Sequence, residues 1–107
     1  MPAKLHHAAV NAVNFEQTVR FFQEVFQMDI DRTAGISPQR KLWFQQGIQV
    51  NEVSSINSSA GLWDHIGIQV PDKTEVLTKA FAFGCTPFPG KTDWFFTPDG
   101  LLIELME

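Results

Sequence analysis

Two histidines and one carboxylate stand where they could bind a divalent metal ion. His7 opens segment 7–14 (HAAVNAVN), and His65 opens the similar segment 65–72 (HIGIQVPD), while Glu104 lies in an apolar stretch near the end of the sequence. Imidazole and carboxylate donors suit ions such as Fe(II) or Mn(II), and three protein ligands leave coordination positions open for substrate. These three residues are therefore the candidate metal ligands, and Glu104 is also the candidate catalytic group.

Each of these residues also has an alternative interpretation without a role in metal binding. A single histidine on a strand is more often a structural residue than a ligand, and Glu104 could be a solvated carboxylate at a sheet edge. Two histidines at equivalent positions of a repeat favour ligation, and an unpaired carboxylate among apolar neighbours would be costly to bury.

The repeat itself predicts how the two halves fold. Asn14 is followed three residues later by Gln17, and Asp72 is followed three residues later by Glu75. Each pair has the pattern of a capping box, which starts a helix. Two copies of a strand running into a capped helix indicate two half-domains related by pseudo-symmetry, within one domain of 107 residues.

Hydrophobic spacing and turn residues extend this pattern along the chain. Strands are expected at 5–13, 28–33, 40–45 and 48–53 in the first half, and at 63–70, 85–88, 92–96 and 101–106 in the second. Helices are expected from 15 to about 27 and from 72 to about 83. Module one thus covers about 1–54 and module two about 62–107, with the polar stretch 54–61 (SSINSSAG) as a linker.

Alternation along a strand assigns the faces. His7 and His65 share their faces with small or polar residues, which is the composition of a cavity wall, whereas the aliphatic faces suit the helices. His6 falls on the opposite face from His7, as a surface or supporting residue. Aligning the two turn glycines 47 and 100 places Asn51 at the position equivalent to Glu104, so Asn51 is a candidate fourth ligand or a residue that supports the ligands.

Composition excludes several functions. The net charge of −4 argues against nucleic acid and anionic membranes as partners, because both need clustered cations. No apolar run is long enough to span a bilayer, and the first residues carry no signal-peptide core, so a cytoplasmic location is expected. Cys85 is the only cysteine, which excludes an intrachain disulfide.

At these residues the chain resembles the vicinal oxygen chelate superfamily, the group of glyoxalases, bleomycin-resistance proteins and extradiol dioxygenases. The resemblance rests on segments 5–10 (LHHAAV), 63–72 (WDHIGIQVPD) and 97–105 (TPDGLLIEL). It implies an α+β fold of two βαβββ modules whose mixed sheet curls into an open barrel around a metal. The family's metal positions map onto His7, Asn51, His65 and Glu104, and Asn51 departs from the family's usual Glu, Gln or His.

The resemblance implies a homodimeric, metal-dependent enzyme that acts on a small oxygen-chelating substrate as a lyase, isomerase or dioxygenase. The ion could be Fe, Mn, Zn or Ni. The alternative is a non-catalytic protein that sequesters a ligand, as bleomycin-resistance proteins do. Candidate substrate-binding residues are Arg32, Arg40, Trp43 and Trp94. The loop 33–39 between the two arginines could gate the cavity or could be an ordinary solvated loop.

Overall fold

The computed structural model describes residues 2–56 and 61–107, and it contains two helices and eight strands. The helices are α1 (Phe15–Phe26) and α2 (Lys73–Phe83). The strands are β1 (Lys4–Ala12), β2 (Ile30–Ala34), β3 (Lys41–Phe44), β4 (Ile48–Glu52), β5 (Trp63–Gln69), β6 (Thr86–Pro87), β7 (Trp94–Phe96) and β8 (Leu102–Met106). These bounds lie within a few residues of those predicted from the sequence. Of the expected linker 54–61, residues 57–60 lie outside the described residues.

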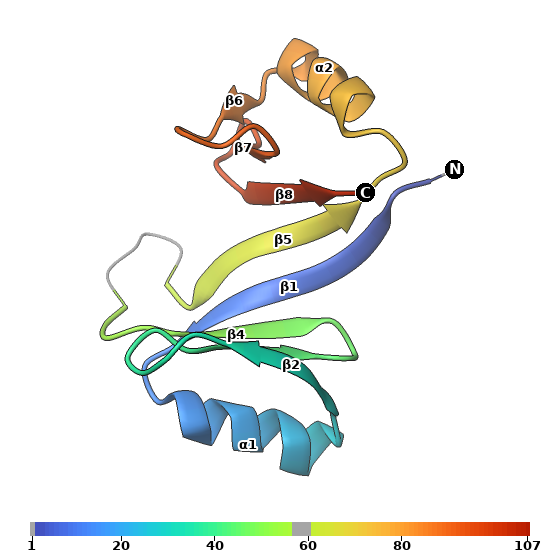
Figure 1. The fold of residues 1–107 in the computed structure, drawn as a ribbon. Helices are drawn as coiled ribbons and strands as arrows, with labels where there is room; N and C mark the ends of the chain where they lie inside the picture. Colours follow the sequence, from blue (N-terminus) through green and yellow to red (C-terminus); the bar gives the residue numbers. More distant parts are fainter. Residues whose placement is uncertain (1, 57–60) are drawn as a thin grey trace. The chain divides into compact units, whose positions relative to one another are not determined.

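The strands follow the order β2-β3-β4-β1-β5-β8-β7-β6 (Figure 1). Strand β1 pairs in parallel with β4, and β5 pairs in parallel with β8, whereas β2–β3, β3–β4, β6–β7 and β7–β8 are antiparallel. The sheet is therefore mixed and unclosed, with β2 and β6 at its ends. This confirms the predicted α+β class and the succession of strand, helix and three strands in each half.

The chain forms two compact units, which we describe separately. The central unit is Ala8–Asp64, and the terminal unit consists of Met1–His7 with His65–Glu107. Strand β1 contributes its first residues to the terminal unit and the rest to the central unit. His7, His65 and Glu104 consequently all belong to the terminal unit.

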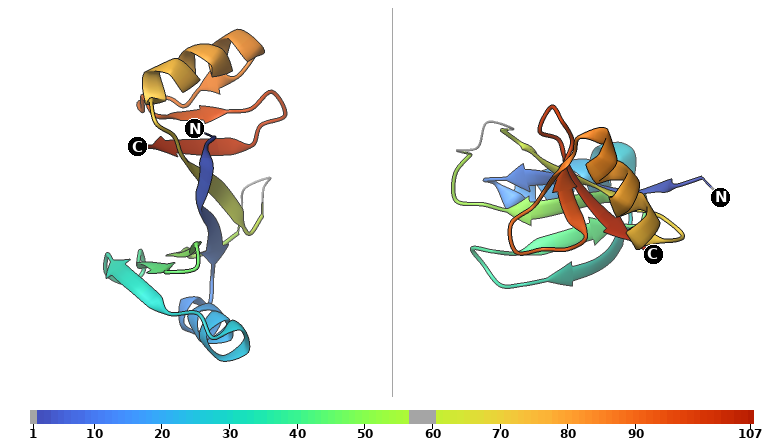
Figure 2. Two further views of the ribbon diagram at one scale, coloured as in Figure 1. Left: turned by 90° about the vertical axis from the view of Figure 1, so that its right-hand side faces the viewer. Right: turned by 90° about the horizontal axis from the view of Figure 1, so that it is seen from above.

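In the central unit, helix α1 packs on one side of the strands (Figure 2). The Asn14 side chain caps the helix by accepting a hydrogen bond from the Gln17 amide at 3.2 Å, and Gln27 ends it with a φ of 56°. Phe15 and Val19 on the helix contribute to one buried core with the strands. The strand members of this core are Ala12, Leu42, Phe44 and Val50. The aliphatic face of β1 and β4 therefore carries the helix, as predicted.

In the terminal unit, helix α2 likewise packs on one side of the strands (Figure 1). Asp72 caps α2 by accepting a hydrogen bond from the Glu75 amide at 3.2 Å, and Gly84 ends the helix at a φ of 118°, which favours glycine. The buried core consists of Val70, Phe95 and Leu105, and residues of α2 pack against it. The opposite face of β5 and β8 is thus left for polar side chains. None of the described helices is long and apolar enough to span a membrane.

Candidate metal centre

The pairing of β5 with β8 brings His65 close to Glu104. The two strands run in parallel with Gly67 opposite Glu104. His65 lies two residues before Gly67 and therefore on the same face of β5. The opposite faces of these strands are occupied by the aliphatic residues that support α2, so the register alone directs both candidate ligands away from the core.

The three candidate ligands converge on one point. Nε2 of His7 lies 3.0 Å from Nε2 of His65, and the Glu104 Oε1 atom lies 3.2 Å from the first nitrogen and 3.1 Å from the second. Both imidazoles are buried, with 5% and 3% of their residue surfaces exposed, and the Glu104 side chain is 24% exposed. The three donor atoms thus form a nearly equilateral triangle, in which Glu104 is the most exposed member.

The size of this triangle fits a metal ion. Donors at right angles around an ion with bonds of roughly 2.1 Å are about 3.0 Å apart, and donors at tetrahedral angles are about 3.4 Å apart. The observed edges of 3.0, 3.1 and 3.2 Å lie at and just above the first value. Two imidazoles and a carboxylate on one face of an octahedral ion would leave three positions open. The donor set therefore fits a divalent ion that also binds substrate.

Glycine at position 67 makes room for the ring of His7. A Cβ atom built on Gly67 would lie 2.9 Å from Nε2 of His7 and closer still to Cε1 and Nδ1, so any side chain there would overlap the imidazole. The sequence analysis grouped Gly67 with the small residues of this face but assigned it no partner. The signal that could have revealed this contact is the glycine inside a strand, because such a glycine often marks a place where another group approaches the backbone closely.

Glu104 is ionised in this environment. Burial raises the pKa of Glu104, but hydrogen bonds from His65 and His7 outweigh the burial, and the pKa falls from 4.5 to about 2. The carboxylate therefore remains charged at neutral pH and is available as an anionic ligand.

His6 contacts His7 although the two residues are adjacent on β1. The Nδ1 atoms of the two rings are 2.9 Å apart, and the rings meet edge to face with centroids separated by 5.2 Å. His6 itself is exposed. His7 therefore has one nitrogen in the ligand triangle and the other against a second histidine.

Trp94 is the candidate substrate-binding residue that lies beside the triangle. It stands opposite Glu104 in the β7–β8 ladder, and its ring centroid is 4.5 Å from that of His65. Phe88 lies 6.0 Å from the Trp94 ring, and Nζ of Lys91 lies 5.4 Å from its centroid. An aromatic wall with a nearby cation thus adjoins one of the ligands.

The other candidate substrate-binding residues belong to the central unit. Arg32 stacks on Trp43 at 3.8 Å, and the two residues face each other across the β2–β3 ladder. Arg40 forms ion pairs with Glu52 at 2.8 Å and with Glu16 at 3.3 Å. The role of these three residues in substrate binding remains a prediction.

The candidate fourth ligand also lies in the central unit. Asn51 is buried in β4, and its Oδ1 atom accepts a hydrogen bond from Nε2 of Gln49 at 2.8 Å. Both residues lie on the face of β4 that was predicted to line the cavity. The role of Asn51 as a ligand remains a prediction.

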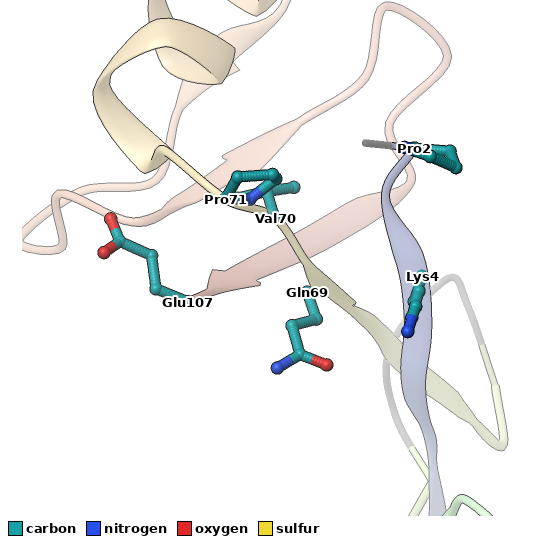
Figure 3. Close-up of a pocket in the computed structure, with 6 residues that line it drawn as sticks. All are labelled: Pro2, Lys4, Gln69, Val70, Pro71 and Glu107. Atoms are coloured by element: carbon teal, nitrogen blue, oxygen red, sulfur yellow. The ribbon is translucent and has the colours of Figure 1, made fainter.

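A separate cavity of about 320 Å³ lies at the far ends of β5 and β8 (Figure 3). It is lined by Pro2, Lys4, Gln69, Val70, Pro71 and Glu107. The Glu107 carboxylate accepts a hydrogen bond from the Lys73 amide at the start of α2. None of the three candidate ligands lines this cavity, so it is distinct from the candidate metal centre.

Comparisons with known proteins find similarity in structure. No protein-family model matches the chain, and no curated protein sequence matches it significantly. Among solved structures, hypothetical protein BH1468 from Bacillus halodurans C-125 has a TM-score of 0.73 and 16% identity, over 98% of this chain and 94% of that one.

Methylmalonyl-CoA epimerases are also structurally similar. The enzyme from Mycobacterium tuberculosis has a TM-score of 0.67 and 14% identity, over 94% of this chain and 85% of that one. A Streptomyces coelicolor variant in complex with 2-nitronate-propionyl-CoA has a TM-score of 0.66 and 17% identity, over 95% and 94%. The chain therefore has the glyoxalase-like fold of the vicinal oxygen chelate proteins, the group that includes methylmalonyl-CoA epimerase.

Proposed function

We propose that this protein is a metal-dependent isomerase of the vicinal oxygen chelate type, acting on a small substrate that offers two neighbouring oxygens. The observation that carries the proposal is the triangle of donor atoms from His7, His65 and Glu104, with edges of 3.0 to 3.2 Å. A divalent ion held there would act as a Lewis acid on the substrate oxygens and make an adjacent C–H bond more acidic.

The chain's own residues have separate tasks in this proposal. His7 and His65 hold the ion with neutral imidazole nitrogens, and the ionised Glu104 supplies the negative ligand. Glu104 is also the candidate base for proton transfer at the substrate carbon, because its second oxygen is free to face the substrate once Oε1 is a ligand. Trp94 is proposed to exclude water from one side of the site, because its ring centroid lies 4.5 Å from that of His65.

The methylmalonyl-CoA epimerases among the structural neighbours favour isomerisation over dioxygenase chemistry. One of them was solved with methylmalonyl-CoA. A methylmalonyl group has a carboxylate and a thioester carbonyl on one carbon, so two oxygens can be chelated while the proton between them is removed. The proposed substrate class is acids that offer two oxygens for chelation, which includes malonyl-type thioesters and small oxo- or hydroxy-acids.

Metal analysis tests the first half of the proposal. Protein purified without a His-tag should bind close to one divalent ion per chain. His65→Ala should lose the ion yet remain folded, because His65 lies outside the buried core around Leu105. Leu5→Ala, an exposed position of β1, is a matched control that should keep the ion. Unchanged metal content in His65→Ala would contradict the site assignment.

Deuterium exchange tests the second half. The metal-loaded protein is incubated with methylmalonyl-CoA in D₂O, and incorporation at the carbon between the two carbonyl groups is followed by mass spectrometry. We expect exchange with the wild type and none with Glu104→Gln at equal metal content. Metal binding without exchange of methylmalonyl-CoA or of small oxo- and hydroxy-acids would leave the metal site standing and contradict the isomerase assignment.

Arg32 and Arg40 are proposed as further contacts for an acidic substrate, with the loop 33–39 as a gate. Guanidinium groups bind carboxylates in two places, which suits such a substrate. The Glu52 side chain accepts hydrogen bonds from Ser37 and Arg40, so it ties this loop to β4. A thermal-shift screen of small carboxylates should find a ligand that binds the wild type but not the Arg32→Ala, Arg40→Ala double variant. Equal binding by both proteins would show that the arginines do not contact the substrate.

The second candidate function is a metal-free ligand-sequestering protein. It is favoured by one observation: the three donor atoms lie at hydrogen-bonding distances from one another, so the triangle can be satisfied by protons alone. Under this alternative, the purified protein holds no ion, and added Zn²⁺ does not change its stability.

A further inference from the structure

We propose that His6 is a positioning residue for the metal centre: its Nδ1 atom accepts the Nδ1 proton of His7 and thereby leaves the Nε2 lone pair of His7 for the ion. The inference rests on the proposed function, since it concerns the metal-loaded protein. It is carried by the 2.9 Å separation of the two Nδ1 atoms and by the direction of His7 Nε2 into the ligand triangle.

The chemistry of a neutral imidazole requires such an acceptor. The ring has one N–H and one lone pair, so a His7 ring that binds an ion through Nε2 must have its proton on Nδ1. His7 is 5% exposed, which leaves little water to accept this proton. Ligating histidines usually donate the other ring N–H to a fixed partner, which sets both the tautomer and the orientation of the ring.

His6 is suited to be this partner. Because His6 is exposed, its Nε2 atom can keep its own proton and donate it to solvent, which leaves Nδ1 as an acceptor. The roughly perpendicular rings, with an interplanar angle of 84°, bring one ring nitrogen against the other without stacking. On the other side, the absence of a side chain at Gly67 allows the His7 ring to occupy this position.

The contact also accommodates the metal-free protein. Without an ion, His7 can keep its proton on Nε2, where Glu104 Oε1 lies 3.2 Å away as an acceptor. His6 then donates from Nδ1 to His7. If His7 held an ion through Nε2, its proton would lie on Nδ1 and the proton of His6 would lie on Nε2, so both rings would change tautomer and the hydrogen bond between them would reverse its direction.

Two variants of His6 separate hydrogen bonding from packing. In His6→Asn, the amide oxygen stands close to the position of Nδ1 and can accept the His7 proton. His6→Leu has a similar size and no acceptor. Leu5→Ala serves as the control for a change at an exposed position of β1. Circular dichroism and the unfolding temperature establish that each variant is folded.

The first readout is the affinity for Zn²⁺, measured by competition with a chromophoric chelator at about pH 8, where free histidines are neutral. We expect His6→Leu to bind Zn²⁺ about 10- to 100-fold more weakly than the wild type, as is typical when the partner of a ligating histidine is removed. His6→Asn and Leu5→Ala should stay within about threefold of the wild type. Equal affinity of His6→Leu and the wild type would overturn the inference.

The second readout is the ¹⁵N NMR spectrum of the His7 ring in the Zn²⁺-loaded protein, which does not depend on activity. We expect Nδ1 of His7 to bear a proton that exchanges slowly in the wild type and in His6→Asn, and rapidly in His6→Leu. An unprotonated Nδ1 would overturn the inference. If the wild type binds no Zn²⁺, both the proposed function and this inference are overturned. If the wild type binds Zn²⁺ and His6→Leu binds it with the same affinity, only this inference is overturned.

Discussion

At the scale of single residues, the candidate metal centre depends on a glycine, because position 67 has room for no side chain. Gly67 is buried, and the His7 imidazole occupies the space that a Cβ atom there would fill. The His7 ring thus lies between Gly67, which has no side chain, and the adjacent His6. The donor geometry depends on this packing as well as on the identities of the ligands.

Gly67→Ala should therefore displace His7 from the triangle. We expect the variant to remain folded, to lose roughly 1–3 kcal/mol of stability through overpacking, and to bind Zn²⁺ at least about tenfold more weakly. Chemical denaturation and Zn²⁺ titration measure the two effects. As a control, Gly67→Ala in a His7→Ala background should cost much less stability, because the overlapping ring has been removed. Equal costs in both backgrounds would contradict the close approach.

Asn51 is tested by the addition of charge. If Asn51 occupies the fourth ligand position, Asn51→Glu should strengthen metal binding by supplying an anionic donor. The competing partner is Gln49, whose Nε2 atom donates to the Oδ1 atom of Asn51. Gln49→Ala is the matched control that removes this partner without adding charge. Unchanged Zn²⁺ affinity in Asn51→Glu would exclude Asn51 as a ligand.

At the scale of elements, two ion pairs of Arg40 join the residue before β3 to β4 and to α1. Arg40 contacts Glu52 on β4 at 2.8 Å and Glu16 on α1 at 3.3 Å. The Arg40 guanidinium, by hydrogen bonding to Glu52, outweighs the effect of burial and lowers the pKa of Glu52 from 4.5 to about 2. The stabilisation from this carboxylate is therefore present above about pH 4.5.

The resulting pH dependence has a definite sign. Because the pKa of Glu52 is lower in the folded state than in the unfolded state, its stabilisation is lost as the pH falls from 4.5 through about 2. We expect the unfolding temperature of the wild type to fall more steeply across this range than that of Glu52→Gln. Glu24→Gln is a control, since Glu24 forms an exposed ion pair within α1 with Arg20. Parallel curves for the wild type and Glu52→Gln would contradict the prediction.

At the scale of the whole molecule, metal binding should stabilise the folded chain. The ligands come from β1, β5 and β8, so the unfolded chain does not hold them together. Zn²⁺ at 100 times its dissociation constant should add about 2.7 kcal/mol, which corresponds to roughly 10–20 °C in the unfolding temperature of a domain of this size. Thermal unfolding with Zn²⁺ and with EDTA measures the shift. A shift of the same size in His65→Ala would show that Zn²⁺ acts elsewhere.

The oligomeric state is a second prediction at this scale. The described surface has exposed large apolar residues on α1, including Phe21, Val25 and Phe26. Clustered apolar residues at a surface often mark an interface between proteins. We expect a homodimer, with a mass about twice the 12.1 kDa of the chain, when light scattering follows size-exclusion chromatography. A monomer over a wide range of concentrations would contradict the prediction.

The sequence by itself determined the elements and the faces of the strands. The caps at Asn14 and Asp72 act over three residues, and alternation along β1 and β5 acts over two, so both can be inferred from neighbouring residue types. These local rules were enough to place the two aliphatic faces against the helices. They also assigned His7, His65 and Glu104 to the faces opposite the helices, where their residue types made them candidate ligands, and the resemblance to a known fold supported the same set.

Only the tertiary structure decided how the donor atoms meet. His7 and His65 are 58 residues apart in sequence, and His65 and Glu104 are 39 apart, so their distances depend on strand register and ring packing rather than on local spacing. The contact of His6 with His7 was not predicted, because strand alternation places neighbouring residues on opposite faces. The close approach at Gly67 arises from the same long-range packing, since a glycine shows only that space is left and not which ring fills it.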